Sequence, residues 1–379
     1  MKKLIIIVVI VLALIFFSLF FIKKNISVQL SVSQVVITED PIRTNIKNMT
    51  IEQKIGQMFL VGNFSAESND ILGRLIIDKK IGSVILLNQN IKNQNVLQVT
   101  SRLQEIASST HQPLLLISVD QEGGIVSRIK EKDSNLTAQN QIDDDDQAYQ
   151  VSKDRGLELL RKGVNVNFSP VLENIINKDS FLYNRVFRGQ KEKIISLGSN
   201  MVQGYQDAGI AATVKHYPGH DDSSVDSHKN LPVSTVENQD FYDYVSPFIE
   251  VIKNKKPLIV MMAHVLFPNI DPVYPATLSP VIINQLRNEY GFDGVIITDD
   301  MNMGAITKNY GIEQSAIQAI KAGNDILLYV STEEDLLRAY NAVISAIENN
   351  EISQGRIDES VYRILKLKEI LNKYATPSI

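Results

Sequence analysis

Histidines and aspartates are concentrated in one short stretch of the chain. Three of the five histidines lie between Lys215 and His228, in the sequence KHYPGHDDSSVDSH, together with three aspartates. Pro218 and Gly219 interrupt this stretch, which predicts an irregular loop rather than a helix or a strand. Imidazoles exchange protons near neutral pH and carboxylates orient them, so these residue types are suited to acid–base chemistry.

Three interpretations of this loop remain open. It could be a polar surface loop. It could hold a metal ion, because the loop offers the ligands His216, His220, Asp222, Asp226 and His228. In the third interpretation, which we favour, Asp226 orients His228 and raises its pKa, so that the imidazole can donate a proton to a leaving group.

Polar side chains also follow other apolar runs, at the point where each run ends. Five runs end in this way, at Asp120, at Asn167, at Lys215 with His216, at His264, and at Asp299 with Asp300. Burying a charge is costly unless it faces a polar cavity. One polar end would be an ordinary strand stop, but five together predict a common site.

The elements that would position these residues are eight predicted strands that alternate with amphipathic helices. The strands are nearly continuous apolar runs, which indicates a parallel sheet covered by helices on both faces. Eight strand–helix units favour a TIM-type (β/α)₈ barrel, in which the ends of all strands meet on one rim. The eight runs are Ile55–Val61, Ile81–Leu87, Pro113–Val119, Val164–Val171, Ile210–His216, Leu258–His264, Gly294–Thr298 and Asp325–Val330.

Composition excludes several classes of protein. The chain has 379 residues, of which 44% are hydrophobic and 21% charged, so it can bury a core and is not disordered as a whole. It has no cysteine, which removes disulfides, thiolate nucleophiles and thiolate metal sites. A formal net charge of −5 argues against a nucleic-acid partner. We expect a monomer.

The first residues predict a membrane segment. Ser18 is the only polar residue between Lys3 and Lys23, and a helix of about 20 residues spans the hydrocarbon core of about 30 Å. The apolar run is longer than that of a cleavable signal peptide. We therefore expect a membrane anchor at 1–24, a linker at 25–48 and a barrel at 49–376. The barrel would lie outside the cytoplasm at the cell membrane, or be secreted if the anchor is cleaved.

Four motifs, in order along the chain, resemble the signature of family 3 glycoside hydrolases. The pattern is most similar to the single-domain β-N-acetylglucosaminidase branch, the NagZ type, and the resemblance spans about Met49 to Tyr374. The motifs are DQEGGIVSRI (Asp120–Ile129), NFSPVLE (Asn167–Glu173), KHYPGHDDSSVDSH (Lys215–His228) and TDDMNM (Thr298–Met303).

The resemblance implies roles for individual residues. Asp299 is expected to be the nucleophile, and His228, assisted by Asp226, the general acid/base. No cofactor and no metal is implied. Two further carboxylates are less clear, since Glu122 could orient Arg128 and Asp300 could cap the helix that follows it. The expected sugar-binding residues are Asp120, Arg128, Arg185, Lys215 and His216.

The activity implied is that of a retaining exo-β-N-acetylglucosaminidase. It would hydrolyse terminal β-N-acetylglucosaminides of peptidoglycan fragments through a covalent glycosyl-aspartate intermediate. One alternative is a β-glucosidase or another β-glycosidase of the same family, and another is a metal-dependent hydrolase using His216, His220 and His228. The chain departs from the family pattern at Asp221-Asp222-Ser223, where Gly-Asp-Thr is usual, and at Val186, where serine is usual. These departures leave fine specificity open.

Overall fold

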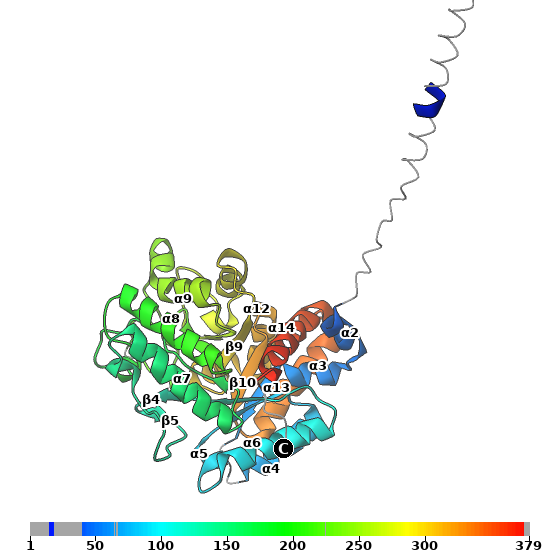
Figure 1. Cartoon of the computed structure of the whole chain (residues 1–379), viewed down its shortest axis with the longest axis horizontal. Coiled ribbons are helices and arrows are strands. Elements are labelled where there is room, and N and C mark those ends of the chain that lie inside the picture. The colour runs from blue at the N-terminus through cyan, green and yellow to red at the C-terminus, as the bar shows by residue number, and fades with distance from the viewer. Residues whose placement is uncertain (1–14, 19–39, 64, 66, 224, 375–379) are drawn as a thin grey trace, which may run out of the picture. The chain divides into compact units, whose positions relative to one another are not determined.

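The computed structural model describes residues 15–18, 40–63, 65, 67–223 and 225–374 (Figure 1). Residues 15–18 are helical, and the rest of the predicted anchor at 1–24 lies outside the described residues. Most of the predicted linker, up to residue 39, lies outside them as well. Within the described ranges, none of the helices combines the length and apolar character needed to cross a bilayer.

Eight parallel strands close into a barrel, and helices surround it (Figure 1). Around the barrel the strands follow the order β1-β10-β9-β8-β7-β6-β3-β2. Each predicted apolar run overlaps one barrel strand, so the predicted eight-stranded barrel is confirmed. The barrel strands are β1 (Phe59–Gly62), β2 (Ser83–Leu86), β3 (Leu116–Val119), β6 (Val166–Asn167), β7 (Ala211–Tyr217), β8 (Ile259–Met262), β9 (Val295–Asp300) and β10 (Ile326–Val330).

The helices owe their positions to apolar faces and polar caps. In α13, for example, Leu336, Tyr340 and Val343 recur on one face and are buried, while Thr332 caps the first turn by accepting a hydrogen bond from the Asp335 backbone N–H. The helices are α2 (Pro41–Asn48), α3 (Ile51–Gln57), α4 (Ser68–Lys79), α5 (Asn88–Ile91), α6 (Val96–Ser109), α7 (Asp145–Arg161), α8 (Lys191–Asp207), α9 (Phe241–Lys255), α10 (Pro280–Asn284), α11 (Gly304–Tyr310), α12 (Ile312–Ala322), α13 (Glu333–Glu348) and α14 (Gln354–Asn372).

Two predicted boundaries differ from the structure. The predicted strand at Ile55–Val61 begins as helix α3 and becomes a strand only at Phe59. Thr50 and Gln53 form a reciprocal capping box, in which each side chain accepts a hydrogen bond from the other residue's backbone N–H, and this starts the helix. The predicted linker at 25–48 ends in helix α2, whose Ile46 is buried in the core.

A short antiparallel hairpin, which the sequence did not predict, follows strand β3. It pairs β4 (Gln121–Gly123) with β5 (Val126–Ser127). Gly123 has φ of 95°, and a Cβ there would lie 2.1 Å from the Thr137 carbonyl oxygen, so a side chain has no space at this turn. The hairpin carries Glu122 at the rim where the strands end.

The amino-terminal end of the barrel contains buried charges of its own. Asp325 precedes β10, is fully buried, and pairs with Arg287 and Arg363. Its carboxylate also accepts hydrogen bonds from the Ser360 hydroxyl at 2.6 Å and from the backbone N–H of Ile296 at 2.9 Å. Both carboxylate oxygens are therefore held by protein donors.

A lysine is buried in the same part of the molecule. Lys368, on α14, is 2% exposed and donates to Gln57 Oε1 at 2.6 Å and to the Gly82 carbonyl oxygen at 2.8 Å. Both acceptors are neutral, so hydrogen bonds replace water around the ammonium group without any balancing carboxylate.

Candidate active site

A cavity of about 390 Å³ lies where the barrel strands end. His228 lines this cavity, whereas Asp226 does not line it and reaches it only through its contact with His228. A second cavity, of about 460 Å³, is lined by residues that include Tyr244 and the candidate metal ligand Asp222, but by none of the predicted catalytic or sugar-binding residues. The predicted site residues that line the 390 Å³ cavity are Asp120, Arg128, Arg185, Lys215, His216, His228 and Asp299.

Two neighbouring carboxylates at the end of β9 have opposite tendencies to ionise. Burial raises the pKa of Asp299, but the imidazoles of His216 and His264 and the backbone N–H of Asp300 outweigh it and lower the pKa to about 2. Burial also raises the pKa of Asp300, and with the charges of Asp299 and Asp120 it brings the value to about 7. At neutral pH Asp299 is thus fully ionised, whereas Asp300 is ionised only in part.

Asp300 does not cap the following helix as the sequence suggested. Its Oδ1 accepts the backbone N–H groups of Asn302 at 3.0 Å and Val330 at 2.9 Å, while Met303 occupies the cap position of α11. These contacts join the end of β9 to the end of β10 and fix the strand tip on which Asp299 sits.

Asp226 and His228 form a pair at the carboxyl-terminal end of the stretch from Lys215 to His228. Asp226 Oδ1 lies 2.8 Å from His228 Nδ1 and accepts the His228 backbone N–H at 3.0 Å. Burial raises the pKa of Asp226, but these contacts with His228 outweigh it and lower the pKa. The ionised carboxylate fixes Nδ1, and the exposed imidazole keeps its Nε2 for another partner.

Lys215 and Glu122 form the centre of a buried ion-pair network. Lys215 Nζ lies 2.9 Å from Asp120 and 2.6 Å from Glu122. Arg185 donates to both oxygens of Glu122, at 2.9 and 2.7 Å. Burial raises the pKa of Glu122, but Arg185 and Lys215 lower it to about 2. Glu122 therefore orients Arg185 and Lys215, whereas Arg128 pairs with Asp120, at 3.8 Å.

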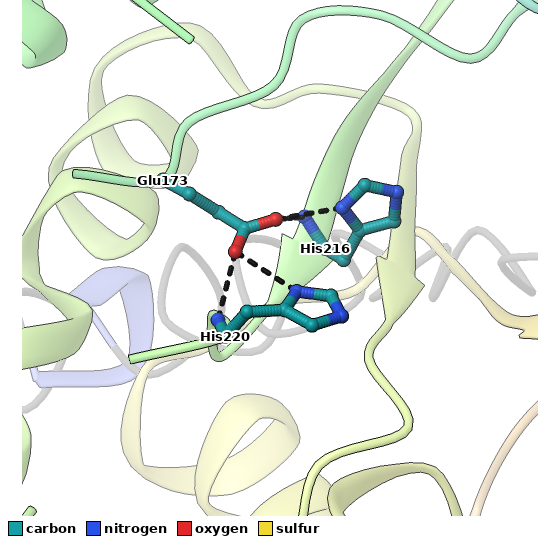
Figure 2. Close-up of side chains that lie close together, drawn as sticks. All are labelled: Glu173, His216 and His220. Carbon is teal, nitrogen blue, oxygen red and sulfur yellow. Dashed lines mark hydrogen bonds and ion pairs between the residues drawn. The ribbon is translucent and has the colours of Figure 1, made fainter. Parts of the chain in front are cut away.

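Glu173 is a site residue to which the sequence gave no role. Its two carboxylate oxygens lie 2.7 Å from His216 Nδ1 and 2.9 Å from His220 Nδ1 (Figure 2). Burial raises the pKa of Glu173, but contacts with His220 and His216 hold it well below its ordinary range. The ionised Glu173 can accept a hydrogen bond from Nδ1 of both imidazoles, so it fixes the orientation of the two rings and leaves Nε2 of each turned away from the carboxylate.

The five candidate metal ligands of the sequence are not brought together. In the described part of the chain, the group with ligand spacing is Glu173, His216 and His220. Asp222 instead accepts the backbone N–H groups of Ile176 and Asn177, at 2.9 and 2.6 Å. Two of the predicted ligands, His216 and His220, therefore lie together with Glu173, which the sequence did not include, and both imidazoles contact its carboxylate through Nδ1.

Asp221 and Asp222, which depart from the family pattern, lie in a loop with positive φ angles, and the third departure, Val186, lies in an apolar cluster. Asp221 and Asp222 have φ of 51° and 52°, a region that aspartate enters more readily than most residues. Asp221 accepts hydrogen bonds from Ser234 Oγ at 2.7 Å and from the Thr235 backbone at 2.9 Å. Val186 is fully buried in a small apolar cluster.

Most of the chain is similar to known proteins. Residues 50–367 match the model of the glycosyl hydrolase family 3 N-terminal domain. The chain is 33% identical over 330 residues to beta-hexosaminidase A of Pseudoalteromonas piscicida, which covers 78% of this chain and 54% of that protein. It is 31% identical over 285 residues to a beta-hexosaminidase of Idiomarina loihiensis, which covers 73% of this chain and 84% of that protein.

Solved structures show the same likeness. A family 3 beta-N-acetylglucosaminidase from Paenibacillus sp. superposes with a TM-score of 0.81 at 37% identity, over 87% of this chain and 64% of that one. The chain thus spans about half the length of the Pseudoalteromonas relative and somewhat under two thirds of the Paenibacillus chain. The ordered motifs, the barrel and the matched residues 50–367 together place this chain in glycosyl hydrolase family 3.

Proposed function

We propose that the chain is a retaining exo-β-N-acetylglucosaminidase. The observation that carries this proposal is that an ionised carboxylate, Asp299, and an imidazole held by a carboxylate, His228, line the same cavity. Glycoside hydrolysis needs an anion at the anomeric carbon and a proton donor at the leaving oxygen. The names of the beta-hexosaminidase and beta-N-acetylglucosaminidase relatives support the choice of sugar.

The chemistry would take place in two displacements. In the first, Asp299 attacks the anomeric carbon, the glycosidic C–O bond breaks, and imidazolium His228 gives its proton to the departing oxygen. In the second, neutral His228 takes a proton from water, whose oxygen attacks the anomeric carbon and releases Asp299. Two inversions restore the original anomeric configuration, which makes the enzyme a retaining one.

The ion-pair network would orient the sugar for this reaction. Lys215, Asp120 and Arg128 lie along the cavity and offer charged donors and acceptors to sugar hydroxyls. Arg185 and His216 line the same cavity and are fixed by Glu122 and Glu173. Groups held in this way lose little freedom on binding, and positioning can supply several kcal/mol of the barrier. The substrates we propose are terminal β-N-acetylglucosaminides of peptidoglycan fragments.

A substrate panel tests the proposal. The full chain is incubated with aryl β-N-acetylglucosaminide and with aryl β-glucoside, and the anomer released first is identified by NMR. We expect preferential cleavage of the N-acetylglucosaminide with the β-anomer as first product. Preferential cleavage of the glucoside would favour the alternative β-glucosidase, and an initial α-anomer would contradict the assignment of Asp299 as nucleophile.

We also propose that residues 1–24 anchor the protein in the cell membrane, with the catalytic unit outside the cytoplasm. The support is the apolar run between Lys3 and Lys23, which has the length of a membrane-spanning helix. Membrane fractionation of cells producing the full chain, followed by protease treatment of intact spheroplasts, tests this arrangement. Recovery of the uncleaved chain in the soluble cytoplasmic fraction would overturn it.

A further inference from the structure

The segment that carries the acid/base histidine, residues 225–230, is held from two sides by contacts that involve neither Asp226 nor the His228 imidazole. We propose that Ser227 and Gly304 are positioning residues that set where His228 stands relative to Asp299. This inference rests on the proposed function of His228. It assigns to His220, a candidate metal ligand in the sequence analysis, the role of a fixed point for the segment.

His220 is suited to this role because it is buried and doubly tied to Glu173. Its side chain is 1% exposed. Glu173 Oε2 accepts the His220 backbone N–H at 2.7 Å and contacts His220 Nδ1 at 2.9 Å (Figure 2). Both the main chain and the ring of His220 are thereby fixed, and its Nε2 is directed away from Glu173 and left for another partner.

Ser227 connects the segment to this fixed point. Its hydroxyl lies 3.2 Å from His220 Nε2, to which it can donate its proton. Ser227 is 1% exposed, whereas the side chain of its neighbour His228 is 60% exposed. The inward-facing residue of the segment is thus Ser227, and it lies between the two members of the Asp226–His228 pair.

The start of helix α11 holds the segment from another side. The backbone N–H groups of Gly304 and Ala305 donate to the carbonyl oxygens of His228 and Ser227, at 3.0 and 3.2 Å. A Cβ on Gly304 would lie 2.5 Å from the Lys229 carbonyl oxygen and 2.9 Å from that of His228, so alanine at 304 would force the segment outward.

The same helix follows strand β9, which ends with Asp299 and Asp300. Contacts to α11 therefore relate the position of His228 to the strand that carries the nucleophile. Phe181 adds an edge contact to the rings of both His220 and His228, with centroids 5.3 and 6.0 Å apart. Three separate contacts thus define one position of the imidazole.

Loosening these contacts should impair proton transfer without impairing attack by Asp299. A phenolate with a high pKa needs a proton to depart, whereas dinitrophenolate departs without one. A displaced His228 would therefore reduce cleavage of the poor leaving group far more than cleavage of the good one. A general loss of folding would reduce both equally.

The experiment compares the full-length wild type with Ser227→Ala and Gly304→Ala. Ser109→Ala is the matched control, because this exposed hydroxyl donates to the Ile106 carbonyl oxygen at 2.8 Å at the end of α6, outside the segment. kcat/KM is measured for phenyl and 2,4-dinitrophenyl β-N-acetylglucosaminides, and hydrogen exchange is followed in peptides covering residues 225–230. We expect a loss of about tenfold or more on the phenyl glycoside, a loss of no more than about threefold on the dinitrophenyl one, and faster exchange in both variants.

The control should behave as the wild type does in both measurements. Equal losses on the two glycosides in Ser227→Ala and Gly304→Ala, or exchange at the wild-type rate, would overturn the inference. If the wild type cleaves neither glycoside, the proposed function fails. The exchange comparison then still decides whether Ser227 and Gly304 hold the segment in place.

Discussion

Both ends of the barrel bury charged side chains, but the two ends differ in how many protein partners each carboxylate has. At the amino-terminal end, both oxygens of Asp325 are taken by Arg287, Arg363, Ser360 and a backbone N–H. At the carboxyl-terminal end, Asp299 accepts one backbone N–H on Oδ1 and otherwise faces the cavity. Burying a carboxylate is costly at either end, but only the second arrangement leaves a charge that can react.

The buried lysines show the reverse distribution: the lysine in the candidate site is paired with carboxylates, and the lysine at the other end is not. Lys215, in the site, lies between two carboxylates; burial lowers its pKa, but Asp120 and Glu122 outweigh this and raise it. Lys368, at the far end, has two neutral acceptors among the described residues, Gln57 and Gly82, and burial lowers its pKa to about 7. Charge balance in the candidate site thus keeps Lys215 cationic, whereas the pKa of Lys368 lies close to neutral pH.

The largest expected effect comes from removing the charge of Asp299, which faces the cavity. Asp299→Asn should lower kcat/KM on an aryl β-N-acetylglucosaminide by about 10⁴-fold, because the amide cannot form the glycosyl intermediate. The melting temperature should stay at or above that of the wild type, since the amide oxygen can still accept the Asp300 N–H. Retention of a tenth of the activity would end the assignment.

Removing the charge of Asp325, which is fully paired, should instead lower stability and leave activity unchanged. Asp325→Asn should lower the free energy of unfolding by about 3–5 kcal/mol, because it leaves buried arginines without their carboxylate. kcat/KM per folded molecule should be unchanged, as urea titration and active-site counting can establish. Glu313→Gln, which breaks an exposed pair with Arg338, is the control and should have little effect on stability.

Glu122→Gln should affect both stability and substrate binding, because Glu122 is buried yet supports the cavity. We expect a loss of about 2 kcal/mol in unfolding free energy, since the change weakens charged hydrogen bonds to Arg185 and Lys215. KM should rise several-fold as Arg185 loses its orientation, and denaturation and steady-state kinetics measure the two effects. A change in kcat alone would contradict this intermediate role.

The smallest effect should come from Lys368→Met, and it should appear as a pH dependence. The pKa of Lys368 is about 7 in the folded chain and 10.5 in the reference state. Between these values the unfolded chain holds a proton that the folded chain lacks, so this lysine makes stability rise with pH by up to about 1.4 kcal/mol per unit. The variant should flatten that slope in urea titrations from pH 7.5 to 9, and an unchanged slope would refute the assignment.

The sequence predicted the barrel and the gathering of the candidate site residues on one rim, because both depend on strand ends. Apolar runs followed by Asp120, by Lys215 with His216, and by Asp299 mark where strands stop, and a closed barrel brings those stops to one rim. The misplaced start of β1 has a local cause, since Ile55 is apolar in either element and only the Thr50–Gln53 capping box identifies the helix.

Partners of the site residues were harder to predict. Glu122 lies in sequence near Arg128 but pairs with Arg185 and Lys215, because the hairpin after β3 directs it across the rim. Glu173 and Ser227 each lie inside a motif that the sequence singled out, yet their roles depend on His220 being buried between them. Pairings between distant loops leave no spacing pattern to read.

The hydrogen bonds from α11 to residues 225–230 have an evolutionary consequence. Gly304 and Ala305 contact the segment through main-chain atoms, and those bonds do not depend on which side chains the segment carries. Val225, Lys229 and Asn230 are exposed. These surface positions can therefore vary in sequence while His228, the proposed proton donor, keeps its place.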